Sequence, residues 1–340
     1  MKAVVYSAPR EFALTELPTP VPAAREVLIR VRQVGICATD LHVHSGHYPA
    51  AFPVIPCHEM VGSVAALGDE VTGFGIGELV TVNPNLPCGV CAACKAARFT
   101  LCTDAKGAGT FFPGFLSEFT CVPESLVFSA EGLDVDTAGF IEPSACAMHG
   151  IEVLGIRPGA TALVIGSGPT GVILAQLIAA SGASAVTVAS PLAHQLDTAR
   201  RLGATRTVLL ERGDPDGNLQ ELLQANGGAQ YDIVVEATGA NEVANICVAL
   251  TANGGTVLIY GVAKPADVMA VHPYELFRRE ITIKGSYAEM TSFGAAIAAL
   301  RAGRARTADI ITHRYPIEEY ATALDAVANN DRAHKVVMAL

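Results

Sequence analysis

A glycine-rich loop between a strand-like apolar run and a helix-like segment constrains the fold most. Gly166, Gly168 and Gly171 are spaced as G-x-G-x-x-G, directly after the run ATALVI and before the segment VILAQLIAAS. The first glycine permits a tight turn, and the second lets a pyrophosphate approach the backbone where the helix begins. The third lets helix and strand pack closely. The pattern therefore predicts a dinucleotide-binding site; the alternative is merely a tight strand-to-helix turn.

The sequence around this loop alternates between strand-like and helix-like segments. From residue 160 onward, helix-like segments separate the apolar runs ATALVIG, SAVTVAS, TRTVLL, YDIVVEATG and TVLIYG. This alternation predicts βαβ units and a parallel, doubly wound sheet. Residues 1 to about 150 hold short strand-like runs between glycines and prolines, which predicts a β-rich domain. A length of 340 residues agrees with roughly two domains, and the tail from about residue 286 adds two helices and a last strand, KVVMAL.

Ser190 stands where dinucleotide-binding folds place the residue that reads the adenosine ribose, at the end of the second strand. An acidic residue there would bond the ribose 2′-hydroxyl and repel a 2′-phosphate, but Val188-Ala189-Ser190-Pro191 contains none. His194, Arg200 and Arg201 follow, yet none comes immediately after the strand, where a phosphate clamp would lie. We expect NADP to be accepted at least comparably to NAD.

Composition and charge exclude several classes of protein. Hydrophobic residues make up 51% of the chain and charged residues only 16%, whereas a disordered chain would be polar and rich in charge. The formal net charge is −10 and there is no extended run of Lys or Arg, so binding to nucleic acid or an anionic membrane is not expected. The N-terminal segment lacks a signal-peptide core, and the uncharged stretch 170–191 fits a buried helix and strand. We expect a soluble, cytoplasmic protein.

Four of the nine cysteines fall together and suggest a closed metal site. The odd total argues against a disulfide framework. The clustered residues follow C-x2-C-x2-C-x7-C, a spacing that can close a tetrahedral cage of four thiolates around zinc. They are Cys88, Cys91, Cys94 and Cys102. An iron–sulfur cluster uses similar spacings, and four incidental cysteines are the other alternative. Four protein ligands leave no open position, so the metal would be structural.

A second constellation lies in the first domain, around Cys37 and the pair His58-Glu59. A thiolate, an imidazole and a carboxylate form a site that suits zinc and leaves room for a further ligand. The Thr39 hydroxyl can hydrogen-bond a substrate oxygen and pass a proton toward His42. Asp40 could hold the outer nitrogen of His58. Taken singly, a cysteine is more typical of core packing and a His-Glu pair of the protein surface. The sequence spacing alone does not show that these side chains lie close together.

Five motifs in a fixed order give the chain a family resemblance. GICATDLH, CHEMVGSVAALGDEV, the four-cysteine segment, IEPSACAMHG and the glycine loop together resemble the zinc-dependent medium-chain alcohol and polyol dehydrogenases, over essentially the whole chain. The resemblance implies an α/β protein with a GroES-like β-rich catalytic domain and a Rossmann coenzyme domain. The catalytic domain would span 1–150 and 286–340, with the zinc lobe at 88–102, and the coenzyme domain 151–285.

The resemblance also implies roles for individual residues. Thr39 and His42 would be the proton relay, and the four clustered cysteines would hold structural zinc. The catalytic zinc would be bound by Cys37, His58, Glu59 and Glu142, of which the two carboxylates act directly or through water. The residues implied in binding NAD or NADP are Gly166, Gly168, Pro169, Thr170, Gly171, Ser190, Thr238 and Gly261.

Glu142-Pro143 matches the branch of sorbitol, xylitol, arabinitol and threonine dehydrogenases. Primary-alcohol dehydrogenases of the family instead carry a cysteine ligand at the position of Glu142. Alternatively, Glu142 is only a charged residue at the start of a helix, directly before Pro143. Three positions depart from the family. Cys57 replaces the usual glycine before His58, Ala38 replaces the usual glycine of the first motif, and Ser190 replaces the acidic residue that reads the ribose. An aromatic substrate contact is absent because Val43 follows His42, and Tyr48 or His47 would have to substitute.

The resemblance implies a zinc-dependent oxidoreductase acting on CH–OH donors, with two zinc ions per chain. It would transfer hydride between a secondary hydroxyl of a polyol or sugar alcohol, or the matching ketose, and NAD or NADP. L-Threonine 3-dehydrogenase and a general secondary-alcohol dehydrogenase are the enzyme alternatives. A non-catalytic nucleotide-sensing protein is a remote alternative, which loss of Cys37 or His58 would favour. A homo-oligomer, dimer or tetramer, is expected.

Overall fold

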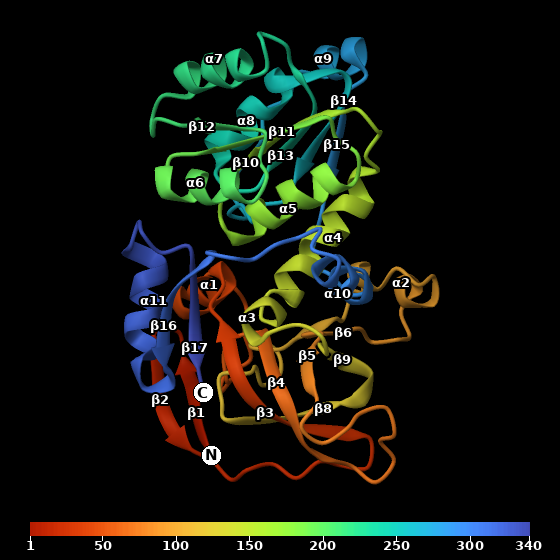
Figure 1. The fold of residues 1–340 in the computed structure, drawn as a ribbon, viewed down its shortest axis with the longest axis vertical. Coiled ribbons are helices and arrows are strands. Elements are labelled where there is room, and N and C mark those ends of the chain that lie inside the picture. Colours follow the sequence, from red (N-terminus) through yellow and green to blue (C-terminus); the bar gives the residue numbers. More distant parts are fainter. The chain divides into compact units, whose positions relative to one another are not determined.

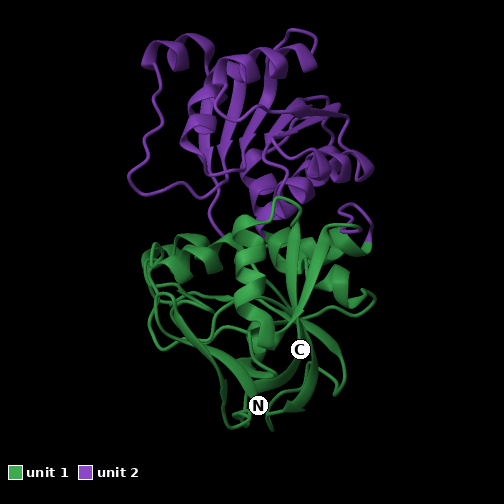
Figure 2. Cartoon of the chain, turned by 90° about the vertical axis from the view of Figure 1, so that its left-hand side faces the viewer, with its two compact units in different colours: residues 1–145, 289–301, 309–340 green, residues 146–288, 302–308 purple.

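The computed structural model describes all 340 residues and divides the chain into two compact units (Figure 2). The first unit comprises residues 1–145, 289–301 and 309–340, and the second comprises 146–288 and 302–308. The short segment 302–308 belongs to the second unit, although the sequence suggests that the whole tail joins the first. Two hydrogen bonds hold it there, because the side-chain amide of Gln176 donates to the Arg306 carbonyl (3.0 Å) and accepts from the Arg306 amide (2.8 Å).

The first unit is built on a seven-stranded sheet in the order β16-β17-β3-β4-β5-β9, with β8 also paired to β3. Its central pair, β3 and β4, is antiparallel. The C-terminal strand β17 lies beside β3 (Figure 1), so the end of the chain completes a sheet begun near its start. The strands are β3 (Glu26–Gly35), β4 (Glu59–Leu67), β5 (Leu79–Val82), β8 (Phe119–Pro123), β9 (Val127–Ser129), β16 (Ile311–Pro316) and β17 (Lys335–Ala339).

Two small sheets and several helices complete this unit. The two-stranded sheets are β1 (Lys2–Ala8) with β2 (Glu11–Glu16), and β6 (Asn85–Leu86) with β7 (Lys106–Gly107). The helices are α1 (Ala38–Ser45), α2 (Ala92–Lys95), α3 (Val135–Ala138), α10 (Phe293–Arg301) and α11 (Tyr320–Asn329). Helix α4 (Ile141–Leu154) begins in this unit and continues along the chain into the second.

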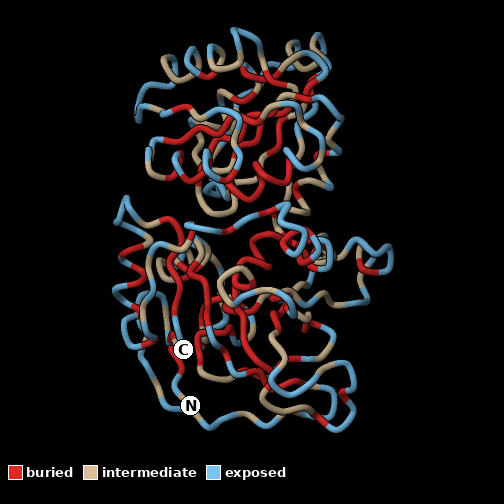
Figure 3. Tube along the Cα trace, viewed as in Figure 1, coloured by how far each residue is buried: buried red, intermediate tan, exposed pale blue.

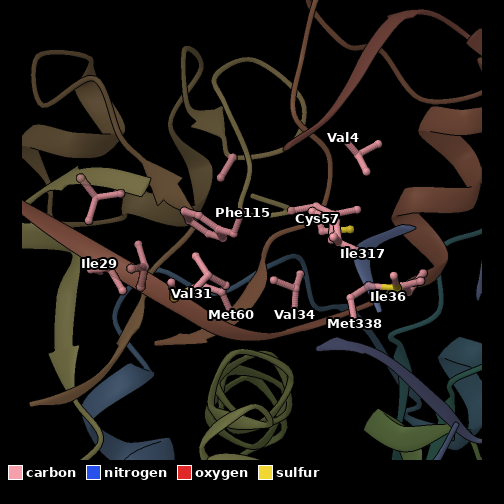
Figure 4. Close-up of a cluster of buried hydrophobic side chains, with 14 of the residues drawn as sticks. Val4, Ile29, Val31, Val34, Ile36, Cys57, Met60, Phe115, Ile317 and Met338 are labelled. Carbon is pink, nitrogen blue, oxygen red and sulfur yellow. The ribbon is translucent and has the colours of Figure 1, made fainter. Parts of the chain in front are cut away.

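The core of the first unit is an apolar cluster between the sheet and the segments that cover it. Alternate side chains of β3 and β4, including Ile29, Val31 and Met60, point into it, together with Phe115 and Met338 (Figure 4). Alternation along a strand places every second side chain on one face, which explains the burial pattern. The red, buried stretches of the tube in Figure 3 follow these strands.

The second unit is a six-stranded parallel sheet in the order β12-β11-β10-β13-β14-β15. Helices cover both faces, α5 and α6 on one and α7 and α8 on the other (Figure 1). The strands are β10 (Thr161–Ile165), β11 (Ala185–Ser190), β12 (Arg206–Leu209), β13 (Tyr231–Glu236), β14 (Thr251–Ile259) and β15 (Thr282–Gly285). The helices are α5 (Pro169–Ala180), α6 (Ala193–Arg201), α7 (Pro215–Ala225), α8 (Asn241–Leu250) and α9 (Pro273–Arg279). This strand order is that of a Rossmann fold, as the sequence predicts.

Candidate active site and metal centres

Cys37, His58 and Glu59 meet in the first unit. Their ligand atoms all lie within 4.8 Å of one another. The sheet register brings them together, because Glu59 at the start of β4 pairs with Gly35 at the end of β3. Cys37 follows two residues later as the N-cap of α1. A pairing between strands therefore joins two sequence motifs that lie about twenty residues apart.

Asp40 fixes the backbone at both ends of this arrangement. Its buried carboxylate accepts hydrogen bonds from the amide of Cys37 (2.8 Å) and from the amide of Cys57 (3.1 Å). Burial raises the pKa of Asp40. The sequence suggests that Asp40 could hold the outer nitrogen of His58; the hydrogen bonds of its carboxylate go to backbone amides, while its charge acts on the imidazole. The carboxylate thus ties the two ligand-bearing loops together through their backbones.

A buried lysine that sequence reasoning missed pairs with Glu59. Lys335, the first residue of β17, forms an ion pair with Glu59 Oε2 and donates to the carbonyl of Ile36 (3.0 Å). Gly35 makes room for this pair, since a Cβ there would meet both Glu59 Oε2 and the Lys335 chain. A single Lys at the start of an apolar strand carries no sequence signal of such a contact.

The electrostatics of this cluster favour a cation. Removal from solvent lowers the pKa of His58, but its hydrogen bond with Cys37 and the charges of Cys37 and Glu142 raise that pKa well above its usual value. A set of acidic groups that strengthens proton binding at an imidazole also strengthens binding of a metal cation. One sulfur, one nitrogen and one carboxylate donor suit zinc and leave a position open. The residues present therefore fit a catalytic zinc ion.

Glu142 lies outside this set of donors but close to it. It stands in the first turn of α4, is buried, and interacts electrostatically with His58, Glu59 and Cys37. Burial, followed by the neighbouring carboxyl of Glu289, raises the pKa of Glu142 well above its usual value. The ligand oxygens of these two glutamates lie within 4.8 Å of each other. No motif in the sequence indicated Glu289.

Thr39 and His42 lie on α1, three residues apart and so on the same side of the helix. The Cys37 thiol donates a 3.8 Å hydrogen bond to Thr39 Oγ1, which places the hydroxyl beside the donor set. No direct hydrogen bond joins the two side chains of Thr39 and His42. A proton passing between them therefore needs a bridging water or substrate hydroxyl.

Cys57 belongs to the core rather than to the metal site. Its side chain is fully buried in the apolar cluster of the first unit (Figure 4). Burial raises the pKa of its thiol well above the usual value. Its backbone has a φ of +67°, the left-handed region that glycine adopts without strain. This conformation explains why the family usually has glycine before His58, and it makes the cysteine the less favourable residue for this turn.

The four clustered cysteines form a second donor set around α2. Their sulfur atoms lie within 4.8 Å of one another. Backbone amides donate to the sulfurs of Cys102 (3.3 Å), Cys88 (3.4 Å) and Cys91 (3.5 Å). Such bonds stabilise thiolates, and they lower the pKa of Cys91 to about 6. The short sheet of β6 and β7 closes the base of this lobe. Four thiolates fit a closed structural zinc site.

We expect two zinc ions of different lability, and a Cys94→Ser variant that has lost one of them. The closed four-thiolate site should resist a chelator that removes the open one. Losing a ligand should lower the free energy of unfolding by more than about 1 kcal/mol. For a chain of a few hundred residues, each 1 kcal/mol lowers the melting temperature by roughly 2–4 °C, so the melting temperature should fall by more than about 4 °C. Metal analysis and thermal unfolding measure both effects, with Cys121→Ser as the control thiol. One zinc or fewer per chain in protein never exposed to chelator would contradict the assignment.

The glycine loop of the second unit has the geometry of a pyrophosphate cradle. Gly166 has a φ of +120°, and a Cβ on Gly171 would lie 2.1 Å from the Gly166 carbonyl, so both positions require glycine. Gly168 is the N-cap of α5, with Pro169 and Thr170 opening the helix. A Cβ built on Gly168 would meet nothing. The helix start therefore presents open space and free backbone amides to an anion.

The other expected coenzyme residues follow the carboxyl ends of neighbouring strands. Ser190 ends β11, Thr238 comes two residues after β13, and Gly261 two residues after β14. These strands and β10 are adjacent in the sheet, and ligands bind at this edge in doubly wound folds. Ser190 is buried, and its hydroxyl accepts a hydrogen bond from the Leu192 amide (3.2 Å). Its side chain places no negative charge at the position where adenosine ribose binding is expected.

Comparison with known proteins agrees with both halves of the chain. Residues 23–132 match the alcohol dehydrogenase GroES-like domain, and residues 169–302 match the zinc-binding dehydrogenase domain. The chain is 35% identical to D-arabinitol dehydrogenase 1 of Uromyces fabae, covering 97% of this chain and 94% of that protein. It is 34% identical to D-altritol 5-dehydrogenase of Agrobacterium fabrum, covering 94% of each.

Solved structures show the same fold and bind both coenzymes. A zinc-binding dehydrogenase of Sinorhizobium meliloti 1021 bound to NADP superposes with a TM-score of 0.93 at 29% identity, over 100% of this chain and 99% of that one. An alcohol dehydrogenase of Escherichia coli CFT073 complexed with NADH has a TM-score of 0.91 at 25% identity, over 100% and 99%. The expected GroES-like and Rossmann architecture is confirmed, as are zinc and a nicotinamide coenzyme. The chain belongs to the zinc-dependent medium-chain dehydrogenase family, in its polyol dehydrogenase-like branch.

Proposed function

We propose that this enzyme oxidises a secondary hydroxyl of a polyol or sugar alcohol, or reduces the matching ketose, with NAD or NADP. The buried carboxyl of Glu142 beside the donor set of Cys37, His58 and Glu59 carries the proposal. A carboxylate accepts hydrogen bonds from hydroxyls next to the reacting one, and only a polyol has them. The names of the arabinitol and altritol dehydrogenases among the relatives support the same substrate class.

In this mechanism the protein positions the substrate and moves its proton. Cys37, His58 and Glu59 would hold zinc, and Glu142 would act directly or through water. When bound, zinc supplies a Lewis acid that makes the substrate hydroxyl more acidic, and the nicotinamide accepts the hydride. The Thr39 hydroxyl takes the hydroxyl proton and passes it outward toward His42. Lys335 keeps the Glu59 carboxylate paired and oriented by holding its Oε2.

The coenzyme would bind at the second unit. Gly166, Gly168, Pro169, Thr170 and Gly171 would hold the pyrophosphate at the start of α5. Ser190 would face the adenosine ribose, while Thr238 and Gly261 would line the same sheet edge. The proposed domains are 1–150 with 286–340 for catalysis, with the structural zinc lobe at 88–102, and 151–285 for the coenzyme; the segment 302–308 is the exception, since it belongs to the second unit.

A panel of alcohols tests the substrate class. With NAD and with NADP, kcat/KM should be higher for arabinitol, xylitol or sorbitol than for propan-2-ol. L-Threonine distinguishes the alternative that shares the Glu-Pro motif, and a relative named L-threonine 3-dehydrogenase is 31% identical. A clear preference for L-threonine or for propan-2-ol over every polyol would overturn the proposal.

We expect a Ser190→Asp substitution to shift coenzyme preference from NADP toward NAD. The wild-type protein should use NADP at least as well as NAD. A carboxylate at this position would bond the ribose 2′-hydroxyl and repel the 2′-phosphate, so kcat/KM for NADP should fall at least about tenfold. Ser190→Asn is the matched neutral control. A strong NAD preference in the wild-type protein would show that another group reads the ribose.

We also propose a homo-oligomer, dimer or tetramer, located in the cytoplasm. The edge strand β15 exposes Ile283, and α9, which precedes it in the chain, exposes Tyr274 and Phe277; unpaired strand edges and exposed large apolar side chains are typical of interfaces between subunits. None of the nine cysteines forms a disulfide, which suits a reducing compartment. None of the helices combines the length and apolar character needed to cross a membrane. Sedimentation equilibrium measures the mass, and a monomer at micromolar concentration would contradict the oligomer.

A further inference from the structure

Glu289 is a buried carboxylate that the proposed mechanism does not use. Its side chain is only 1% exposed. The Asn85 side-chain amide donates to Glu289 Oε1 (2.8 Å) and also reaches the Glu289 carbonyl (3.3 Å). The asparagine therefore holds both the backbone and one carboxylate oxygen. A buried carboxylate costs free energy, so a position that keeps one calls for a functional explanation.

The backbone around Glu289 is fixed by further contacts. Asn83 is buried, and its side-chain amide donates to the Met290 carbonyl (3.1 Å). The preceding residue, Ala288, has a φ of +51°, a left-handed conformation that costs free energy for a residue other than glycine. Two asparagine clamps and one strained residue thus hold the Glu289 carboxylate in one place.

Glu142 has the donor residues and Glu289 as its charged neighbours. Glu142 interacts with the donor residues His58, Glu59 and Cys37 on one side. On its other side, the Glu289 carboxylate lies within 4.8 Å of the Glu142 carboxylate. The ligand atoms of Cys37, His58 and Glu59 form one set. Glu142 and Glu289 belong to a second set, together with Cys146. Glu289 therefore lies beside Glu142 and, like Glu142, outside the set of the three donors.

We propose that Glu289 is a specificity-determining residue that accepts a hydrogen bond from a substrate hydroxyl beyond the one that meets Glu142. This inference rests on the proposed polyol activity and adds a second recognition point to the same site. The reacting oxygen would lie at Cys37, His58 and Glu59, the next hydroxyl at Glu142, and a further hydroxyl at Glu289.

The chemistry of a polyol matches such a row of acceptors. Each hydroxyl of a polyol can donate a proton, and consecutive hydroxyls are a few ångströms apart along the chain. Two buried carboxyl groups side by side do not readily ionise together, and hydrogen bonds donated by a ligand favour their ionised form. A monoalcohol offers no donor to either carboxylate, and a vicinal diol offers one to Glu142 only. The site would thus favour substrates with three or more hydroxyls.

A Glu289→Gln substitution tests the assignment with substrates of increasing hydroxyl number. Glutamine keeps the carbonyl oxygen that accepts from Asn85, so the fold should be retained. We expect kcat/KM to fall about 10- to 100-fold for a pentitol, because a charge-assisted hydrogen bond is lost. The fall should be much smaller for butane-2,3-diol and propan-2-ol. Glu289→Asp, which keeps the charge but withdraws it, should give an intermediate loss. Glu131→Gln, an exposed glutamate of the same unit, is the control.

The outcomes separate this inference from the proposed function and from an indirect effect. If the wild-type protein does not prefer polyols, the proposed function fails before any variant is compared. If it prefers them but Glu289→Gln changes kcat/KM equally for all three substrates, or not at all, the Glu289 assignment is wrong. In a Glu142→Gln background, a direct contact predicts that Glu289→Gln still lowers pentitol kcat/KM. Loss of that effect would mean that Glu289 acts only through Glu142, and the assignment would again fail.

Discussion

Replacing Thr39 by valine should lower kcat/KM by about 100-fold or more for every secondary alcohol alike. Valine has nearly the same shape but cannot accept the proton of the substrate hydroxyl. The loss is independent of substrate because each alcohol must release the same proton. Steady-state kinetics with propan-2-ol and a pentitol, together with zinc analysis of the variant, measure the effect.

Two further variants show whether the loss belongs to proton transfer. Thr39→Ser keeps the hydroxyl and should retain most of the activity. His42→Ala should have a milder effect than Thr39→Val, because bulk water can replace the outer group of the relay. If Thr39→Val and Thr39→Ser are equally impaired, packing beside Cys37 would explain the loss and the relay would be wrong.

Replacing Glu142 by glutamine should lower kcat/KM by roughly 10- to 100-fold for polyols and much less for propan-2-ol. A charge-assisted hydrogen bond is worth about 1.5–3 kcal/mol, and the partner hydroxyl exists only on the polyol. The structure supports this difference, because Glu142 lies beside the donor set of Cys37, His58 and Glu59 but not within it. Kinetics with both substrate types measure the ratio.

Glu152→Gln serves as the control, since it changes a partly exposed glutamate later in the same helix. Zinc content should remain at two per chain in both variants. An equal loss on polyols and simple alcohols would mean that Glu142 serves the metal and not substrate choice. The polyol assignment would then lose its main support among the residues.

The sequence predicts best where a short motif contains its own physical reason. The glycine loop is one such case, because Gly166 needs a positive φ and Gly171 needs the absence of a side chain. The alternation of strands and helices from residue 160 onward likewise predicts the parallel sheet, since each element buries a face of its own. The four-cysteine lobe is local in sequence, and its ligands are brought together by one short helix and one loop.

Contacts between distant strands were beyond the reach of the sequence. Lys335 meets Glu59 only because β17 pairs with β3, and β3 pairs with β4. Glu289 reaches Asn85 across about two hundred residues of chain. The sequence points to Asp40, but its hydrogen-bond partners are backbone amides, which carry no residue-specific pattern. The resemblance implies the metal ligands, and the structure adds the residues around them that come from distant parts of the chain.

Selective removal of the labile zinc tests most directly that Cys37, His58 and Glu59 hold the metal on which polyol oxidation depends. A brief treatment with chelator should reduce the zinc content from two to one per chain, while the four-thiolate lobe keeps its ion. The account predicts that oxidation of a pentitol is then lost and returns when zinc is added back. Unchanged activity in protein that retains only the zinc of the cysteine lobe would contradict it.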